Sequence, residues 1–253
     1  MPIALFAGPD RGPFISAHRG YSAVAPENTL AALEAALAAG AHVAEIDVRL
    51  TRDGQLVLMH DATLGRTTDG RGPVSALTLA EIRTLDAGRW FDRKFAGTRV
   101  PTLDEVLAWS RGRLGILVEL KNCPERHPKF IAEIIAAIER QNATDFAIPA
   151  GFDHPSLAEI HRRRPTWILE MIVPCRLVDT AHAARAAGAQ LLSLEPEYTV
   201  KSDVRDMHAA GLSVLTSLLS VEHGRELHEI GVDFFETNDV QLAGDALRAL
   251  GRG

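Results

Sequence analysis

The amino-acid sequence predicts a (β/α)8 TIM barrel with a small insertion after the second strand. The chain has 253 residues, close to the roughly 250 typical of a single barrel of this kind. Short β-rich runs alternate with Ala- and Leu-rich segments of helical periodicity, which is the pattern of a parallel sheet built from βα units. Eight strand-like runs favour a closed barrel over an open sheet, and they lie near residues 14–18, 42–48, 115–120, 146–151, 167–173, 190–194, 212–217 and 233–237.

The predicted helices fill the intervals between these strands. The first is almost entirely Ala and Leu, begins after Asn28 or Thr29, which are both good N-cap residues, and ends at Gly40. The sequence shows no internal repeat or interdomain linker, so we expect one barrel domain over residues 1–253. The helices are expected near residues 29–39, 102–111, 128–140, 155–163, 179–187, 202–210, 222–229 and 240–250.

One stretch breaks the alternation of strands and helices. After the second strand, a further strand-like run at 56–59 is followed by an aperiodic segment rich in Gly, Thr and Asp at 61–74. We interpret residues 61–101 as an insertion above one end of the barrel. Barrel active sites are built from the loops at the carboxyl ends of the strands, so this insertion is a candidate part of a site.

Composition excludes several classes of function. The net charge is −6 and there is no basic stripe, so a nucleic-acid partner is not expected, although a few local cations can hold a small anion. Two cysteines are too few for a disulfide framework, and Cys123 is expected to be a small hydrophobe rather than a reactive thiol. The N-terminus lacks the cationic region of a signal peptide, and no apolar run reaches the ~18 residues of a membrane span, which predicts a cytoplasmic protein without stable membrane association.

Three of the predicted strands end in polar residues that are unusual in a barrel wall. In two strands the polar residues lie two apart, so their side chains point the same way. Carboxylates on one face repel each other unless a cation or a proton neutralises them. Catalytic residues of barrels lie at the carboxyl ends of strands, which makes these residues site candidates. They are His18 and Arg19 on the first strand, Glu45 and Asp47 on the second, and Glu119 and Lys121 at 115–121.

A hairpin is predicted to bring His60 to the same place. Asp53-Gly54 is a strong signal for a two-residue hairpin turn. With these two residues at the centre of the turn, Asp47 lies directly across from His60. Facing residues of paired strands have Cβ atoms roughly 4.5–5.5 Å apart, so His60 would lie beside the carboxylates, in a register that a shift of one residue would undo.

These residue types point to phosphate chemistry. The three carboxylates could ligate one hard divalent cation, Mg²⁺ or Ca²⁺. Arginine and lysine are suitable donors to phosphate oxygens, and two histidines can supply one base and one acid near neutral pH. Lys121 could instead neutralise Glu119 as an ion pair and would still lie at the site. Arg66, with Thr67 and Thr68, is either a substrate contact or part of a turn network.

The sequence resembles the glycerophosphodiester phosphodiesterase family. The match is nearly continuous from about residue 15 to residue 121 and covers seven specific motifs. They are AHRG (17–20), APENT (25–29), EIDVRLTRDG (45–54), HDATLGRTT (60–68), DAGRWF (86–91), VPTLDEVL (100–107) and ELK (119–121). The resemblance implies a (β/α)8 barrel in which Glu45, Asp47 and Glu119 bind the metal, His18 and His60 are the acid–base pair, and Arg19 and Lys121 hold the phosphate.

The carboxyl-terminal half departs from the family pattern. Relatives usually carry a Trp-Thr-Val-Asn-like run on the seventh strand, where this chain reads LTSL (215–218), so we expect Leu215 and Leu218 to replace the Trp and the Asn. The last strand usually ends in Thr-Asp with Pro two residues later, where this chain reads TNDV (237–240). The wall around the alcohol part of the substrate is therefore expected to differ, with Glu170 or Glu195 as candidate replacements.

The resemblance implies a metal-dependent hydrolysis of a glycerophosphodiester, a small-molecule substrate, to sn-glycerol 3-phosphate and an alcohol. The sequence leaves open which histidine is the base, whether water or a substrate hydroxyl attacks, and the oligomeric state. One alternative is a phospholipase of the same superfamily acting on lipid headgroups, for which Trp90, Phe91 and Phe95 are the only candidate apolar rim. A second alternative is a non-catalytic phosphate-binding barrel.

Overall fold

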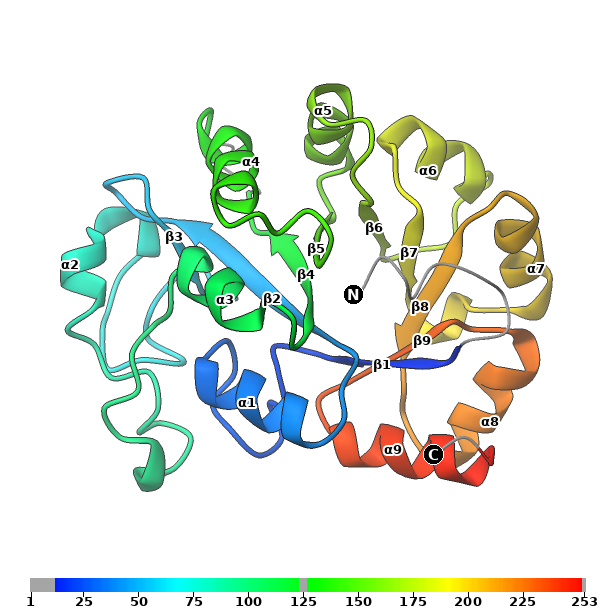
Figure 1. The fold of residues 1–253 in the computed structure, drawn as a ribbon, viewed down its shortest axis with the longest axis horizontal. Coiled ribbons are helices and arrows are strands. Elements are labelled where there is room, and N and C mark those ends of the chain that lie inside the picture. The colour runs from blue at the N-terminus through cyan, green and yellow to red at the C-terminus, as the bar shows by residue number, and fades with distance from the viewer. Residues whose placement is uncertain (1–11, 123–126, 252–253) are drawn as a thin grey trace.

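The computed structural model describes residues 12–122 and 127–251, and its strands form a closed parallel barrel surrounded by helices (Figure 1). Each strand pairs with the next along the ring, and β9 pairs with β1 to close it. The predicted fold class is confirmed, while Cys123 lies outside the described residues. The barrel strands are β1 (Phe14–Ala17), β2 (Val43–Leu50), β4 (Gly115–Leu120), β5 (Ala147–Gly151), β6 (Glu170–Val173), β7 (Leu191–Leu194), β8 (Ser213–Ser217) and β9 (Phe234–Thr237).

The helices begin where side chains cap their first free N–H groups. Thr29, rather than Asn28, is the N-cap of α1, and its hydroxyl accepts from the N–H of Ala32. Thr102 and Glu105 form a reciprocal capping box at α3. Within the described residues, no helix combines the length and the apolar character that crossing a membrane requires. The outer helices are α1 (Leu30–Ala38), α3 (Leu103–Ser110), α4 (Phe130–Arg140), α5 (His154–Arg163), α6 (Thr180–Ala187), α7 (Lys201–Ala209), α8 (Val221–Ile230) and α9 (Val240–Ala249).

Side chains that face into the barrel form stacked layers, because alternate residues of a strand point the same way. The lowest layer is apolar and consists of Phe14, Val43, Leu117, Ile148, Leu191, Leu215 and Phe234, with Ile168 packed against them. Two residues further along each strand lies what we call the middle layer: Ser16, Glu45, Glu119, Ala150, Glu170, Ser193, Ser217 and Glu236. The polar groups of the barrel interior therefore begin halfway up and continue to the carboxyl ends of the strands.

The hairpin after β2 forms, but its register differs from the predicted one by a residue. Strand β3 (Leu56–Leu58) pairs antiparallel with the end of β2. The N–H of Met59 donates to the carbonyl of Asp47 at 2.9 Å, so Met59, and not His60, lies opposite Asp47. His60 is the residue that follows, and it reaches the site from the loop after the strand.

The length of the turn explains the shift. The N–H of Thr51 donates to the carbonyl of Gln55, which leaves a loop of three residues rather than two. The last of them, Gly54, has a φ of +78°, the left-handed conformation that ends a three-residue hairpin loop. An Asp-Gly pair is compatible with both loop lengths, so the sequence pattern selected the wrong one.

Residues 61–101 pack beside β2 and β3, outside the ring of barrel strands (Figure 1). The hydroxyl of Thr67 donates to Met59 Sδ, and that of Thr68 donates to the carbonyl of Leu64, so both belong to an internal network of the insertion. A small apolar core of Val57, Met59, Leu64, Val74, Ile82, Ala87 and Val100 supports this region. Its short helices are η2 (Val74–Ala76), α2 (Leu79–Ile82) and η3 (Arg93–Phe95).

Candidate active site

Three buried carboxylates meet at the carboxyl ends of β2 and β4. One ligand atom from each of Glu45, Asp47 and Glu119 lies within 4.8 Å of the others, and the three residues are 4%, 0% and 6% exposed. Parallel pairing of β2 with β4 places Asp47 beside Glu119 and brings the two segments together. Across residues 12–122 and 127–251, no other group of three potential metal ligands is this compact. This carboxylate triad could therefore hold a metal ion.

The electrostatics of the triad fit a cation. Glu45 Oε1 is buried without a hydrogen-bond partner, while Glu45 Oε2 accepts from the backbone N–H of Arg19 at 2.9 Å. Burial, followed by repulsion from Asp47 and Glu119, raises the pKa of Glu45 well above its ordinary value. Burial and the Asp47 charge also raise the pKa of Glu119. A divalent ion would remove this repulsion and occupy the open oxygen.

Two cations lie against the triad. Lys121 Nζ is 3.0 Å from Asp47 Oδ1 and also forms an ion pair with Glu119, so the predicted ion pair exists and lies within the site. Arg19 Nε lies 3.4 Å from Asp47 Oδ2. Burial alone would lower the pKa of Lys121, but Asp47 and Glu119 outweigh burial and raise it, which keeps the ammonium charged. Burial likewise tends to raise the pKa of Asp47, but Lys121 and Arg19 hold it below its ordinary value.

The turn after β1 gives Arg19 its position. Arg19 takes a left-handed φ of +59°, which directs its N–H to Glu45. Gly20 follows with a φ of +79°, and a Cβ atom there would lie 2.8 Å from the backbone of Ala32 in α1. Only glycine fits this close approach between the turn and the helix. In the AHRG motif, Arg19 is therefore a candidate functional residue, and Gly20 is required for packing against α1.

Asn28 holds Asp47 from both ends. Its Nδ2 donates to Asp47 Oδ2 at 2.6 Å, and its Oδ1 accepts from the backbone N–H of Asp47 at 2.9 Å. Asn28 is 4% exposed and has a φ of +57°, a conformation that asparagine tolerates better than most residues. The sequence analysis considered Asn28 only as a helix cap. The sequence signal that could have identified Asn28 as a partner of Asp47 was its place in the APENT motif, directly before the N-cap Thr29.

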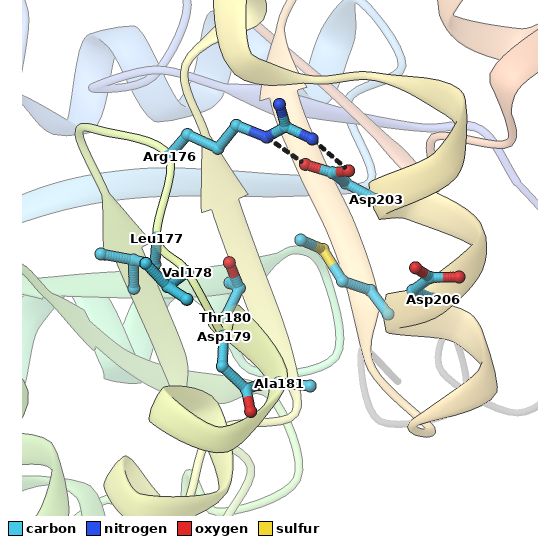
Figure 2. A pocket seen from close by; sticks show the side chains of 9 residues that line it. Arg176, Leu177, Val178, Asp179, Thr180, Ala181, Asp203 and Asp206 are labelled. Carbon is cyan, nitrogen blue, oxygen red and sulfur yellow. Dashed lines mark hydrogen bonds and ion pairs between the residues drawn. The ribbon is translucent and has the colours of Figure 1, made fainter.

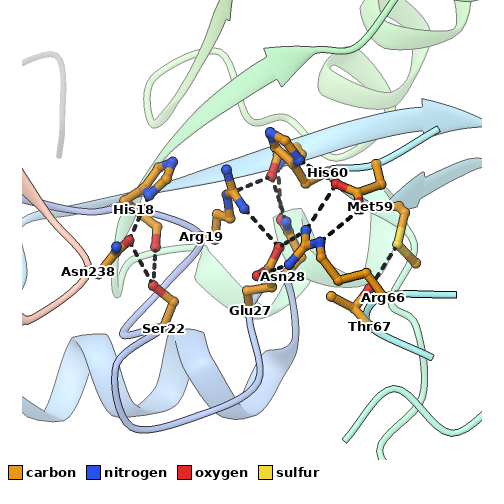
Figure 3. Close-up of polar contacts among 12 residues, drawn as sticks. His18, Arg19, Ser22, Glu27, Asn28, Met59, His60, Arg66, Thr67 and Asn238 are labelled. Atoms are coloured by element: carbon orange, nitrogen blue, oxygen red, sulfur yellow. Dashed lines mark hydrogen bonds and ion pairs between the residues drawn. The ribbon is translucent and has the colours of Figure 1, made fainter. Parts of the chain in front are cut away.

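His60 is oriented by a chain of ion pairs in the insertion (Figure 3). Its Nδ1 lies 2.7 Å from Asp61 Oδ1, and Asp61 accepts from Arg66 Nε at 2.8 Å. Arg66 also contacts both oxygens of Glu27 at 2.7 Å, and Glu27 accepts from Arg19 at 3.0 Å. Because a carboxylate only accepts, Nδ1 of His60 carries the proton and Nε2 is left as an acceptor. Burial lowers the pKa of His60, against the opposing effect of Asp61.

His18 is oriented by a neutral partner. Its Nδ1 lies 2.7 Å from Oδ1 of Asn238, which also accepts from the hydroxyl of Ser22 at 3.0 Å (Figure 3). The amide oxygen accepts, so Nδ1 of His18 donates and Nε2 remains available. Asp61 and Asn238 were missed as partners, although Asp61 directly follows His60 and the departure TNDV had singled out the segment containing Asn238.

A cavity of about 350 Å³ opens above the middle layer and connects the triad with the far side of the barrel. Glu170 lines that far side, and Glu236 lines the cavity from β9, next to β1. Glu170 is 2% exposed, and its Oε2 has no hydrogen-bond partner. Burial, then repulsion from Glu236 and Glu119, raises the pKa of Glu170 well above its ordinary value. Burial also raises the pKa of Glu236, which accepts from the hydroxyl of Ser16 at 3.3 Å.

Three of the four residues that the sequence analysis named for the substrate wall line this cavity. Leu218 lines the cavity, as do Glu170 and Glu195. Leu215 does not, because it is fully buried in the apolar layer beneath the glutamates. Ser217, two residues further along β8, is the residue of that strand that faces the cavity. Leu215, which takes the place of the family's Trp in the sequence, therefore does not contribute to the wall of this cavity.

A second cavity, of about 490 Å³, lies between the start of α6 and α7 (Figure 2). Arg176 on its rim forms two hydrogen bonds with Asp203, at 2.8 and 2.9 Å, so its charge is already paired. Val178 is fully exposed beside them. This cavity contains none of the predicted site residues, and its size alone assigns it no function.

Comparisons with known proteins agree with the geometry. Residues 18–242 match the model of the glycerophosphoryl diester phosphodiesterase family. The chain is 40% identical over 185 residues to a glycerophosphodiester phosphodiesterase of Caldanaerobacter subterraneus, covering 73% of this chain and 75% of that one. It is 35% identical over 237 residues to the enzyme of that name from Bacillus subtilis, covering 85% and 78%.

Solved structures give the same result. The crystal structure of a glycerophosphodiester phosphodiesterase from Agrobacterium tumefaciens has a TM-score of 0.80 and 32% identity, covering 91% of this chain and 98% of that one. A phosphodiesterase of Oleispira antarctica in complex with the product sn-glycerol-3-phosphate has a TM-score of 0.88 and 29% identity, covering 93% and 97%. The family match spans most of the chain, and the named relatives share one enzyme class, that of phosphoric diester hydrolases. The chain belongs to the glycerophosphoryl diester phosphodiesterase family.

Proposed function

We propose that this protein hydrolyses a glycerophosphodiester to sn-glycerol 3-phosphate and an alcohol, with one divalent cation, Mg²⁺ or Ca²⁺, at the carboxylate triad. The buried triad carries this proposal, because its three carboxylates face only two cations and one of its oxygens is unpartnered. Membership of the family supports the same reaction. The complex of the Oleispira antarctica phosphodiesterase with sn-glycerol-3-phosphate supports a small anionic product.

The residues at the triad would bind the phosphate and stabilise its charge. When bound, the cation would act as a Lewis acid on a non-bridging phosphate oxygen. Arg19 and Lys121 neutralise the remaining negative charge, which grows in the transition state. Asn28 fixes Asp47 through two hydrogen bonds, so the carboxylate keeps its orientation while the substrate exchanges. Positioning of this kind lowers the reorganisation needed during the reaction.

The two histidines are assigned different roles because their partners differ. His60 has a lowered pKa and is therefore neutral at pH 7, and Asp61 stabilises the imidazolium that forms when Nε2 takes a proton. We assign His60 as the base that deprotonates the nucleophile. Nδ1 of His18 is hydrogen-bonded to the amide oxygen of Asn238 rather than to a carboxylate, which leaves Nε2 to deliver a proton to the leaving alkoxide. We assign His18 as the acid.

Product analysis tests this function. Purified protein is incubated with glycerophosphoethanolamine, and sn-glycerol 3-phosphate is measured before chelation, after chelation, and after Mg²⁺ or Ca²⁺ is restored. We expect activity that is lost with the chelator and recovered with the cation. Chelator-insensitive hydrolysis would contradict the cation, and the absence of product would contradict the reaction. Preferred cleavage of intact phospholipid in vesicles would favour the phospholipase alternative.

A time course by phosphorus NMR separates the two nucleophiles. Attack by the neighbouring hydroxyl of the glycerol group passes through a cyclic phosphate, whereas attack by water gives the monoester directly. The same spectra identify which alcohol is released. Parallel reactions with His60→Ala show whether formation or opening of such a cyclic ester depends on the proposed base.

A further inference from the structure

The middle layer of the barrel contains four glutamates, and only two of them belong to the triad. Glu119, Ala150 and Glu170 are aligned in one row across β4, β5 and β6. Glu236 extends the layer on β9, beside β1. The cavity therefore has two further acidic residues, Glu170 on β6 and Glu236 on β9, and Glu170 lies about two strand spacings, or roughly 10 Å, along the wall from Glu119.

The state of Glu170 indicates that this part of the cavity is a candidate ligand site. Its side chain is almost fully buried and lines the cavity, yet Oε2 has no hydrogen-bond partner. An unsatisfied buried carboxylate oxygen is costly and calls for an explanation, and a positively charged group bound in the cavity supplies one. Among the described residues lining the cavity, His18 is the only side chain that can carry a positive charge, and it lies next to Asn238.

The chemistry of the ligand follows from the charges and the spacing. A second metal ion fits poorly, because the triad is the only described group of three ligands compact enough for one. A quaternary ammonium group has no N–H to donate and is usually held by several aromatic rings, whereas Phe152 is the one Phe, Tyr or Trp among the described lining residues. A primary ammonium group carries the required charge and can donate to Oε2 of Glu170.

We propose that Glu170, with Glu236 lining the same cavity, binds a primary ammonium group on the alcohol part of the substrate, so that the preferred substrates are glycerophosphodiesters of amino alcohols. This inference rests on the proposed function. The phosphate lies on the side of Arg19 and Lys121, and the ammonium group lies on the glutamate side. The two ends of a zwitterionic diester thereby meet opposite charges within one small cavity.

The test compares two diesters that differ only in the terminal group of the alcohol. Glycerophosphoethanolamine and its isostere glycerophosphopropanol, in which an uncharged methyl group replaces the ammonium, are each assayed for kcat/KM. The wild-type protein is expected to prefer the ethanolamine ester by roughly 10- to 100-fold, the range for a hydrogen bond to a charged group. Glycerophosphocholine is expected to fall well below the ethanolamine ester. In E170Q the ratio of ethanolamine to propanol kcat/KM is expected to fall about tenfold or more.

Two further variants make the result decisive. E197Q removes one negative charge from an exposed residue that does not line the cavity, and it should leave the ratio unchanged. E236Q removes the other glutamate that lines the cavity outside the triad and should also lower the ratio, which keeps the proposal testable if E170Q does not fold. A purely structural defect would lower both kcat/KM values together and leave their ratio as in the wild type, which would overturn the proposal.

The outcomes also separate this inference from the reaction itself. If both diesters are hydrolysed by the wild-type protein at equal kcat/KM, the proposed function stands and the ammonium site is overturned. A preference for glycerophosphocholine over the ethanolamine ester would overturn the primary ammonium. If neither diester is hydrolysed, both the proposed function and this inference are overturned.

Discussion

Asp61 is expected to act on the reaction through His60. Its carboxylate lies 2.7 Å from Nδ1 of His60 and is 30% exposed, so solvent screens part of the interaction. A hydrogen bond to a charged group is worth about 1.5–3 kcal/mol, and partial exposure favours the lower end, or roughly tenfold. Asp61→Asn should therefore lower kcat about 10- to 30-fold and change KM much less. Because Asp61 raises the pKa of His60, its loss should move the acidic limb of the pH profile to lower pH.

The measurement is kcat and kcat/KM on a glycerophosphodiester from pH 5 to 9 at saturating cation. Asp92→Asn is the matched control, since Asp92 is an exposed carboxylate in the same insertion that caps η3 instead of contacting a histidine. An unchanged kcat together with an unchanged acidic limb in Asp61→Asn would refute the reasoning. An equal loss in the control would show that the effect comes from the insertion as a whole.

Three other predictions follow from the contacts of the site. His18→Ala and His60→Ala should each reduce turnover by roughly 10²- to 10⁴-fold while binding changes much less, and a near-wild-type rate would remove that histidine's role. Asn28→Ala should lower the free energy of unfolding by about 2–4 kcal/mol in urea titrations, since Asp47 loses two buried hydrogen bonds; a loss below 1 kcal/mol would contradict this. Glu27→Gln should cost about 1 kcal/mol at pH 7. Arg66 and Arg19 hold the pKa of Glu27 below its ordinary value despite burial, so the difference between the wild type and Glu27→Gln should shrink as the pH falls through that lowered pKa. A difference that persists at low pH would argue against this explanation.

Much of the fold could be predicted because barrel strands and helices carry strong local signals. The buried strand β4 and the Ala-rich helix α1 differ from their predicted bounds by no more than a residue. The hairpin register could not be predicted, since Asp53-Gly54 suits a two-residue or a three-residue turn. A shift of one residue was enough to replace His60 by Met59 opposite Asp47.

The site was predictable where two polar residues recur two apart on an apolar strand, as Glu45 and Asp47 do. Contacts between distant segments could not be predicted from the sequence. The hydrogen bond between Asn238 and His18, for example, forms because β9 pairs with β1 and closes the barrel. Glu170 was only a candidate replacement in the sequence. Glu170 lies two residues beyond Ile168, which packs against the apolar layer inside the barrel. The side chain of Glu170 therefore faces the barrel interior as well, which became clear only once the layers were known.

The central claim is that the carboxylate triad holds a divalent cation, and calorimetric titration tests it most directly. Mg²⁺ and Ca²⁺ are titrated separately into chelator-treated wild-type protein and into Glu45→Gln, which keeps the shape of the residue whose Oε1 is unpartnered. Glu197→Gln is again the control for a lost surface charge. One bound ion per chain in the wild type and the control, with at least tenfold weaker binding in Glu45→Gln, is the predicted result. No binding by the wild type, or equal affinity in Glu45→Gln, would contradict the claim.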